Sequence, residues 1–253
     1  MKSEELLIIT GARGMLGKVL VDHFTITKKY LSVLSIDFMN TNRTLNENEK
    51  YFDLDITDEA KIREFYLTLS TKYSDVKKLY LINCAGISVF EDFDLRTKDS
   101  FMKVLEVNLY GTFNMIQNTA RLARQLGAEC SIVNTGSLFG SRSPDERNYV
   151  DLNRKNSEVY GASKAGVEQM TRYFSAHLAK FNTRVNCVSP GGILNEAQPQ
   201  GEQFQKLYNY KVPMGRLAYY KEMIGAYEFL LSSSSANYVT GQNIYVDGGY
   251  TSW

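Results

Sequence analysis

The chain has 253 residues, of which 43% are hydrophobic and 23% charged, and its formal net charge at pH 7 is +1. This composition is ordinary for a globular protein, and a charge so close to zero makes nucleic acid or an anionic membrane an unexpected partner. The three cysteines are widely separated, so we expect no zinc site. The charged amino terminus argues against a secretory signal, and no apolar run reaches the roughly 18 residues of a membrane span. We therefore expect a cytoplasmic location.

Short apolar runs alternate with longer helical patterns along the whole chain. Continuous apolarity is typical of strands covered on both faces, and strand–helix alternation predicts a doubly wound, mainly parallel α/β sheet in one domain. The predicted strands are Leu6–Thr10, Val33–Asp37, a weaker candidate at Tyr51–Leu54, Leu79–Asn83, Ser131–Asn134, Val185–Val188 and Ile244–Val246. The predicted helices include Glu59–Tyr73, Ser100–Leu126 and Tyr160–Lys180.

Two polar segments interrupt this rhythm. Ser141–Val159 separates a strand from a helix, and Ile193–Val212 follows Pro190-Gly191-Gly192. Ligands of open α/β sheets bind beyond the carboxyl ends of the strands, where such loops converge. We interpret the two segments as a substrate pocket and its lid, with ordinary surface loops as the alternative.

The segment Thr10–Gly17 ends the first predicted strand and opens the first helix. Its glycines permit a tight turn and close approach to a pyrophosphate, which the free N–H groups of the helix start can bind. The strand before, the helix after and an acidic residue downstream are the context that a dinucleotide site requires. The candidate cofactor contacts here are Gly11, Arg13, Gly14, Met15, Leu16 and Gly17.

The acidic residue is Asp37, at the end of the second predicted strand. Its carboxylate can accept hydrogen bonds from the adenosine ribose and would repel a 2′-phosphate, which favours NAD. Arg13 favours NADP, because a guanidinium in the glycine loop can pair with that phosphate. We give Asp37 the greater weight and predict NAD, with NADP as the alternative.

Tyr160 and Lys164 are candidates for proton transfer. Their spacing of four places both side chains on one face of a helix. A tyrosine with its usual pKa near 10 is a poor base at neutral pH, and a neighbouring ammonium favours the phenolate. Such a pair is common by chance and carries little weight alone.

Further motifs make the sequence resemble the short form of the short-chain dehydrogenase/reductase family over essentially its whole length. That resemblance implies a single Rossmann-fold domain with a seven-stranded sheet. The motifs are Asn83-Cys-Ala-Gly86, Val107-Asn-Leu-Tyr-Gly111, Ile132-Val-Asn-Thr-Gly-Ser137, Tyr160-x-x-x-Lys164, Asn186-Cys-Val-Ser-Pro-Gly191, Val239-Thr-Gly-Gln242 and Val246-Asp-Gly-Gly249.

The resemblance implies a catalytic role for four residues. Ser137 would hold the substrate oxygen, and Tyr160 would donate the proton to a carbonyl or take it from an alcohol. Lys164 would bind the nicotinamide ribose and lower the tyrosine pKa, and Asn108 would anchor a water that continues the proton path.

The resemblance also implies cofactor contacts beyond the glycine loop. Asp55 would sit against the adenine and Asn83 would hold the cofactor-side strand ends, with turn formation and capping as the alternative for both. Ile193 would contact the carboxamide, although Asn195 stands where the family often has threonine. The remaining implied contacts are Ile56, Ala85, Gly86, Asn108, Tyr160, Lys164, Pro190 and Gly191.

The sequence departs from the short form at two places. Its glycines are spaced as Gly11-x-x-Gly14-x-x-Gly17, as in the extended branch of the family, although the chain closes on the short form's final motif. The interval from Ser137 to Tyr160 is about ten residues longer than usual. A longer surface loop there still allows the catalytic residues to assemble.

The polar, tyrosine-bearing segment Asn195–Val212 favours a polyhydroxylated or phosphorylated sugar over an acyl chain. Arginines of the 141–159 segment are possible substrate contacts, and the segment is similar to that of oxidoreductases from bacterial surface-sugar or flagellin-modification clusters. The alternatives are a 3-oxoacyl-carrier-protein reductase and a non-catalytic dinucleotide sensor. The resemblance also implies a homodimer or homotetramer, with the Tyr160 helix, the Ser100–Leu126 helix and the carboxyl terminus at the interfaces.

Overall fold

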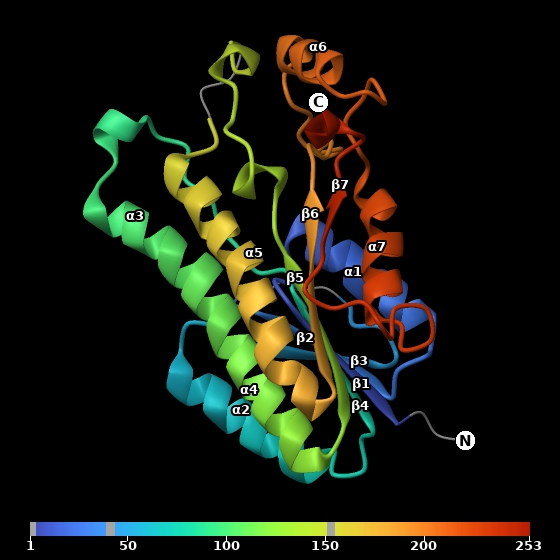
Figure 1. Cartoon of the computed structure of the whole chain (residues 1–253). Helices are drawn as coiled ribbons and strands as arrows, with labels where there is room; N and C mark the ends of the chain where they lie inside the picture. The colour runs from blue at the N-terminus through green and yellow to red at the C-terminus, as the bar shows by residue number, and fades with distance from the viewer. Residues whose placement is uncertain (1–3, 39–43, 151–154) are drawn as a thin grey trace.

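All strands in the described part of the chain belong to one parallel sheet. The computed structural model describes residues 4–38, 44–150 and 155–253. The seven-stranded sheet has the order β3-β2-β1-β4-β5-β6-β7 (Figure 1). The strands are β1 (Glu5–Thr10), β2 (Ser32–Asp37), β3 (Glu49–Asp53), β4 (Lys78–Asn83), β5 (Glu129–Thr135), β6 (Thr183–Pro190) and β7 (Asn243–Val246).

Helices cover both faces of this sheet. In Figure 1, α2, α4 and α5 lie on one side of the sheet, and α1 and α7 lie on the other. Each interface holds its own buried apolar cluster, one containing Leu81 and Met115 and the other Ile9 and Tyr227. The helices are α1 (Met15–Ile26), α2 (Glu59–Lys72), α3 (Lys98–Leu105), α4 (Thr112–Leu126), α5 (Glu158–Leu178), α6 (Glu202–Tyr210) and α7 (Ile224–Leu231).

The predicted doubly wound α/β sheet is therefore confirmed, and each predicted strand is present with small differences at its ends. Every residue of β2 and of β6 is buried, as expected of strands that are covered on both faces. No helix of the described residues is long and apolar enough to cross a membrane.

The predicted helical stretch Ser100–Leu126 is helical throughout, but it is not one continuous α-helix. A π-helical segment, Glu106–Gly111, separates α3 from α4. In such a segment the backbone carbonyls accept from the N–H five residues on instead of four. At its end the Thr112 hydroxyl also donates to the Asn108 carbonyl at 2.8 Å. Apolar periodicity does not detect such a local widening.

The strand order reverses direction at β1, which has β2 on one side and β4 on the other. The loops that follow β1 and β4 consequently leave in different directions, and a crevice opens at the carboxyl edge between them. The helix α6 and the segment before α5 lie at this same end of the molecule (Figure 1).

The backbone comes unusually close together where β1 and β4 end. Gly11 has φ +65°, and a Cβ added there would lie 2.6 Å from the Ala85 backbone. Only glycine satisfies both conditions without strain. The Thr10 hydroxyl accepts from the N–H groups of Cys84 and Ala85 at 3.2 Å each, which holds the two strand ends together.

We predict that Gly11→Ala is more destabilising than Gly127→Ala, which serves as its matched control. Gly127 has φ +62° with nothing within 4 Å of an added Cβ, so its substitution measures the left-handed backbone alone, at about 1–2 kcal/mol. The overlap with Ala85 adds about 1–3 kcal/mol at Gly11. Urea unfolding of both variants measures the difference, and equal losses of stability would contradict the close approach.

Candidate active site

Two cavities flank the start of α1 at the carboxyl edge of the sheet. We call them the Asp37 cavity, of about 340 Å³, and the Tyr160 cavity, of about 270 Å³. Gly14, the residue before α1, lines the first, and Leu16 lines the second. The amino terminus of α1, with its unpaired N–H groups, therefore lies between the two cavities.

Most of the residues predicted to bind a cofactor or substrate line one of these cavities. Those at the Asp37 cavity are Gly11, Gly14, Asp37, Asp55, Ile56, Ala85 and Gly86. Those at the Tyr160 cavity are Leu16, Ser137, Tyr160, Pro190, Gly191 and Ile193. The predicted residues that line neither cavity are Arg13, Met15, Gly17, Asn83, Asn108 and Lys164.

Asp37 lies at the end of β2 and is 8% exposed. Its carboxylate accepts a hydrogen bond from the backbone N–H of Arg13 at 2.8 Å, which fixes it beside the glycine loop. The Arg13 side chain points elsewhere, because its guanidinium pairs with Glu49 at 3.1 Å and lies over the Tyr51 ring, 4.2 Å from its centroid.

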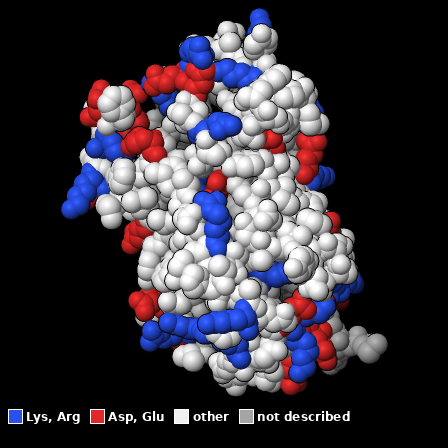
Figure 2. Space-filling view, in the orientation of Figure 1, with Lys and Arg blue, Asp and Glu red and all other residues white. Residues whose placement is uncertain are grey.

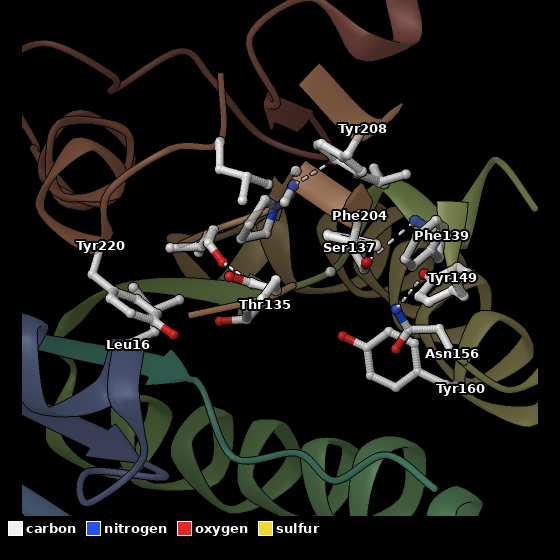
Figure 3. A pocket seen from close by; sticks show the side chains of 18 of the residues that line it. Leu16, Thr135, Ser137, Phe139, Tyr149, Asn156, Tyr160, Phe204, Tyr208 and Tyr220 are labelled. Atoms are coloured by element: carbon white, nitrogen blue, oxygen red, sulfur yellow. Dashed lines mark hydrogen bonds between the residues drawn. The ribbon is translucent and has the colours of Figure 1, made fainter. Parts of the chain in front are cut away.

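Ser137 and Tyr160 share the Tyr160 cavity although they come from different elements. Figure 3 shows their hydroxyl groups on facing sides of this cavity. Ser137 follows β5, and its Oγ accepts from the Phe139 N–H at 3.2 Å. Tyr160 lies in the first turn of α5, where its own N–H donates to the side chain of Ser157, the N-cap residue. The helix therefore begins at Glu158, two residues before the predicted start.

Lys164 is buried beneath Tyr160 on the same helix. Its ammonium donates to the Thr135 carbonyl at 2.8 Å and lies 5.7 Å from the centroid of the Tyr160 ring. A Cβ on Gly86 would come within 3.4 Å of the Lys164 Nζ and 3.3 Å of the Asn108 Oδ1. The glycine thus leaves space beside the ammonium group, between β4 and α5.

Asn108 faces this space from the π-helical segment and is fully buried. Its side chain bonds both backbone groups of Ile87, accepting from the N–H at 2.8 Å and donating to the carbonyl at 2.9 Å. It also donates to the Ser163 hydroxyl at 3.0 Å. Asn108 therefore joins the loop after β4 to α5.

Asp55 makes the local turn bonds that were the alternative for it, whereas Asn83 bonds a residue of the neighbouring strand. The Asp55 carboxylate accepts from the N–H and hydroxyl of Thr57, both at 2.8 Å, while the residue also lines the Asp37 cavity. The Asn83 amide donates to Asn134 at 2.9 Å and so joins the ends of β4 and β5. Asn195 accepts from the N–H groups of Ala197 and Gln198.

The 141–159 and 193–212 segments are joined into one cap. Lys211, after α6, forms an ion pair with Asp145 of the first segment, and the indole N–H of Trp253 donates to the Lys211 carbonyl at 3.2 Å. Arg147 and Lys211 hold the pKa of Asp145 well below its usual range. Aromatic contact adds to these bonds, because the Tyr149 ring lies 5.2 Å from the ring of Phe204 in α6.

The described cations of the first segment do not line the Tyr160 cavity. Arg142 donates to the carbonyls of Ser141 and Thr251, Arg147 pairs with Asp145, and Lys155 pairs with Asp92 and Glu146. These contacts hold the cap together. Arg154 lies outside the described residues.

Several cavity residues were not singled out in the sequence. One is the buried Tyr208 of α6, whose hydroxyl accepts from the Gly192 N–H at 2.6 Å. Burial raises the pKa of Tyr208 well above its usual value, so the group stays a neutral phenol. Asn156 donates to the Tyr149 hydroxyl at 3.3 Å, and Gln200 donates to the Ile193 carbonyl at 2.8 Å. All of these residues lie in the two segments, so only the predicted lid pointed to them.

Comparison with known proteins places this site in a family. Residues 33–251 match a family model described as enoyl-(acyl carrier protein) reductase. The chain is 31% identical to the NADH-dependent L-xylulose reductase of Ambrosiozyma monospora over 98% of this chain and 95% of that protein. The chain belongs to the short-chain dehydrogenase/reductase family. It is therefore an oxidoreductase of the class that acts on CH–OH groups.

Two further members of this family resemble the chain along almost its whole length. One is the NAD-dependent glycerol dehydrogenase of Listeria innocua, 28% identical over 98% of this chain and 94% of that enzyme. The other is a solved short-chain dehydrogenase from Leptospira borgpetersenii with bound NAD+, 36% identical with a TM-score of 0.88, covering 98% of this chain and 93% of that one.

Proposed function

We propose that this short-chain dehydrogenase/reductase interconverts a secondary alcohol and a ketone on a neutral sugar or polyol, with NAD as its cofactor. The observation that carries the proposal is the pairing of Ser137 and Tyr160 hydroxyls in a cavity beside the start of α1. The relatives named for L-xylulose and glycerol, and the neighbour with bound NAD+, support the substrate class and the cofactor.

The chain's residues fit NAD. The amino terminus of α1 lies between the two cavities and suits a pyrophosphate, while the Asp37 carboxylate suits the hydroxyls of an adenosine ribose. Gly86 leaves open the space beside the Lys164 ammonium that a Cβ would occupy, which suits the second ribose. When bound, the nicotinamide supplies a hydride to the carbonyl carbon or takes one from the alcohol carbon.

Proton transfer is assigned to Tyr160. In the reduction its hydroxyl donates a proton to the carbonyl oxygen, and in the oxidation its phenolate takes the proton from the alcohol. The Ser137 hydroxyl donates to the same oxygen and holds it in place. The buried Lys164 lies behind Tyr160 and is held by the Thr135 carbonyl, and Asn108 holds the loop and helix that position it.

A neutral substrate is favoured by the lining of the Tyr160 cavity. None of the described residues that line it is charged. Its polar groups are hydroxyls and amides, including those of Tyr149, Asn156, Gln200 and Tyr208, set among aromatic rings. Such groups bind sugar hydroxyls, whereas a phosphate needs a cation or several N–H donors. We therefore favour an unphosphorylated sugar or polyol.

The other two functions have less support. A 3-oxoacyl-carrier-protein reductase that uses NADPH fits poorly with Asp37 at the ribose position and with an Arg13 guanidinium that is paired to Glu49. A non-catalytic sensor would not need Tyr160 and Ser137 in one cavity with Lys164 behind them.

We predict that Tyr160→Phe lowers kcat by about 10²–10⁴-fold, because the variant lacks the group that transfers the proton. NADH binding, followed by its fluorescence, should change little. Tyr238→Phe is the control, since Tyr238 is fully exposed and does not line the Tyr160 cavity. Full turnover by Tyr160→Phe would sink the proposed mechanism.

The cavity lining predicts discrimination against phosphorylated substrates. For a neutral pentitol or ketopentose that is turned over, the phosphate ester of the same compound should show a kcat/KM at least tenfold lower, because no described cation offsets its desolvation. Steady-state assays of such pairs measure this ratio. A preference for the ester would exclude the neutral class and leave the oxidoreductase assignment intact.

We also propose that the chain forms a homodimer through α4 and α5. These helices lie side by side on the outer face in Figure 1, and Figure 2 shows the middle of this face as mostly uncharged. Exposed aromatic side chains lie on this part of the chain, including Tyr173, which stacks on His177 with centroids 4.0 Å apart, and Tyr110, which is 39% exposed.

Light scattering of the purified protein should give a mass of about twice the 28.8 kDa of one chain, or a whole multiple of that dimer mass. Tyr173→Glu places a charge in the proposed interface and should shift the protein toward monomer. Tyr238→Glu should leave the mass unchanged, because Tyr238 is fully exposed on the loop after α7, away from the proposed interface. A monomeric wild-type protein would contradict the proposal.

A further inference from the structure

The Arg13 side chain is directed away from the Asp37 cavity, although the Arg13 backbone N–H donates to Asp37, which lines that cavity. The side chain is 3% exposed and runs back along β3, where it contacts first Tyr51 and then Glu49. Both contacts precede Asp53, the last residue of β3, so the guanidinium lies behind the carboxyl edge at which the cavity opens. Arg13 is not among the residues that line the cavity.

Glu49 is built into this position by several bonds. Its carboxylate side chain is fully buried and accepts from the Ser35 hydroxyl of β2 at 2.8 Å, in addition to the Arg13 contact at 3.1 Å. The Asn46 N–H donates to its other oxygen at 3.3 Å. Glu49 is thus oriented by bonds that do not involve Arg13, and both side chains of the ion pair are buried.

Tyr51 closes the arrangement. Its ring lies under the guanidinium, and its hydroxyl donates to the Asp37 carbonyl at 2.9 Å. The Asp37 carboxylate in turn accepts from the Arg13 N–H. The anion at the cavity and the cation withdrawn from it are therefore held by one connected set of contacts from the glycine loop, β2 and β3.

We propose that Glu49 is a specificity-determining residue, which keeps the site selective for NAD by holding the Arg13 guanidinium away from the position of an adenosine 2′-phosphate. This inference rests on the proposed function, because it concerns the same cofactor site. Asp37 repels the phosphate, and Glu49 holds back the Arg13 guanidinium, which could otherwise compensate for that repulsion. Lys103 also lines the Asp37 cavity, and its ammonium pairs with Glu106 at 3.1 Å. Selectivity for NAD thus has two sources, of which only Asp37 stands in the cavity.

Glu49→Gln tests the proposal, because it keeps the shape and the Ser35 contact while removing the charge. A guanidinium buried without its counterion gains from turning toward a phosphate. We expect the ratio of the Kd for NADPH to the Kd for NADH, both measured by fluorescence titration, to fall at least tenfold. Glu47→Gln is the matched control, since Glu47 is exposed and pairs with Lys28, and its ratio should not change.

The double variant Arg13→Gln/Glu49→Gln should lose the gain in NADPH binding, which shows that the gain passes through Arg13. Tyr51→Leu removes the ring that supports the guanidinium and should shift the ratio in the same direction, so it decides the matter if Glu49→Gln does not fold. An unchanged ratio in a folded Glu49→Gln, or a gain that persists in the double variant, overturns the proposal. If the wild-type protein binds neither nucleotide, the proposed function fails instead.

Discussion

The approach of Gly11 to the backbone at Ala85 is the constraint on which the site depends. It joins the ends of β1 and β4 at the point where the strand order reverses, and the Thr10 hydroxyl reinforces it by accepting from two N–H groups of the β4 loop. With those ends held together, the loops must diverge above them. The start of α1 is then placed between two cavities, which gives one strand end access to both halves of a dinucleotide site.

Helix α5 places the proposed proton-transfer residue, Tyr160, in that crevice. Its N-cap at Ser157 sets the first turn, and the first turn presents Tyr160 to the cavity. One turn later Lys164 reaches back to the Thr135 carbonyl at the end of β5, so the ammonium is fixed relative to the sheet as well as to the helix. The widened segment at Asn108 completes the support, because a side chain there bonds the β4 loop and α5 at once.

Charged side chains lie around the Tyr160 cavity and do not line it in the described residues. The described lining of the Tyr160 cavity is uncharged, whereas the ion pairs of the cap lie outside it and join segments distant in sequence, as Lys211 and Asp145 do. On the cofactor side, Asp37, Asp55 and Lys103 line the Asp37 cavity, and the Arg13 guanidinium is turned away from it. The net charge of the chain is only +1, so the proposed selectivity for NAD and for a neutral substrate depends on the direction of a few charged side chains.

The sequence by itself predicted the sheet and the glycine loop, because these follow from local periodicity and from short motifs. It also placed Tyr160 and Lys164 on one helix face by their spacing, whereas the set of Ser137, Tyr160 and Lys164 followed from the family resemblance that the motifs carry. It did not determine the π-helical segment at Asn108, since the widening of one turn leaves the apolar pattern unchanged. Nor did it determine the direction of Arg13, whose guanidinium was the feature of the sequence that favoured NADP. Glu49 lies 36 residues away and becomes its partner only through the parallel register of β2 and β3, which places Glu49 opposite Val33 and Tyr51 opposite Ser35. Side-chain direction at that range is set by strand pairing, and strand pairing exists only in the folded chain.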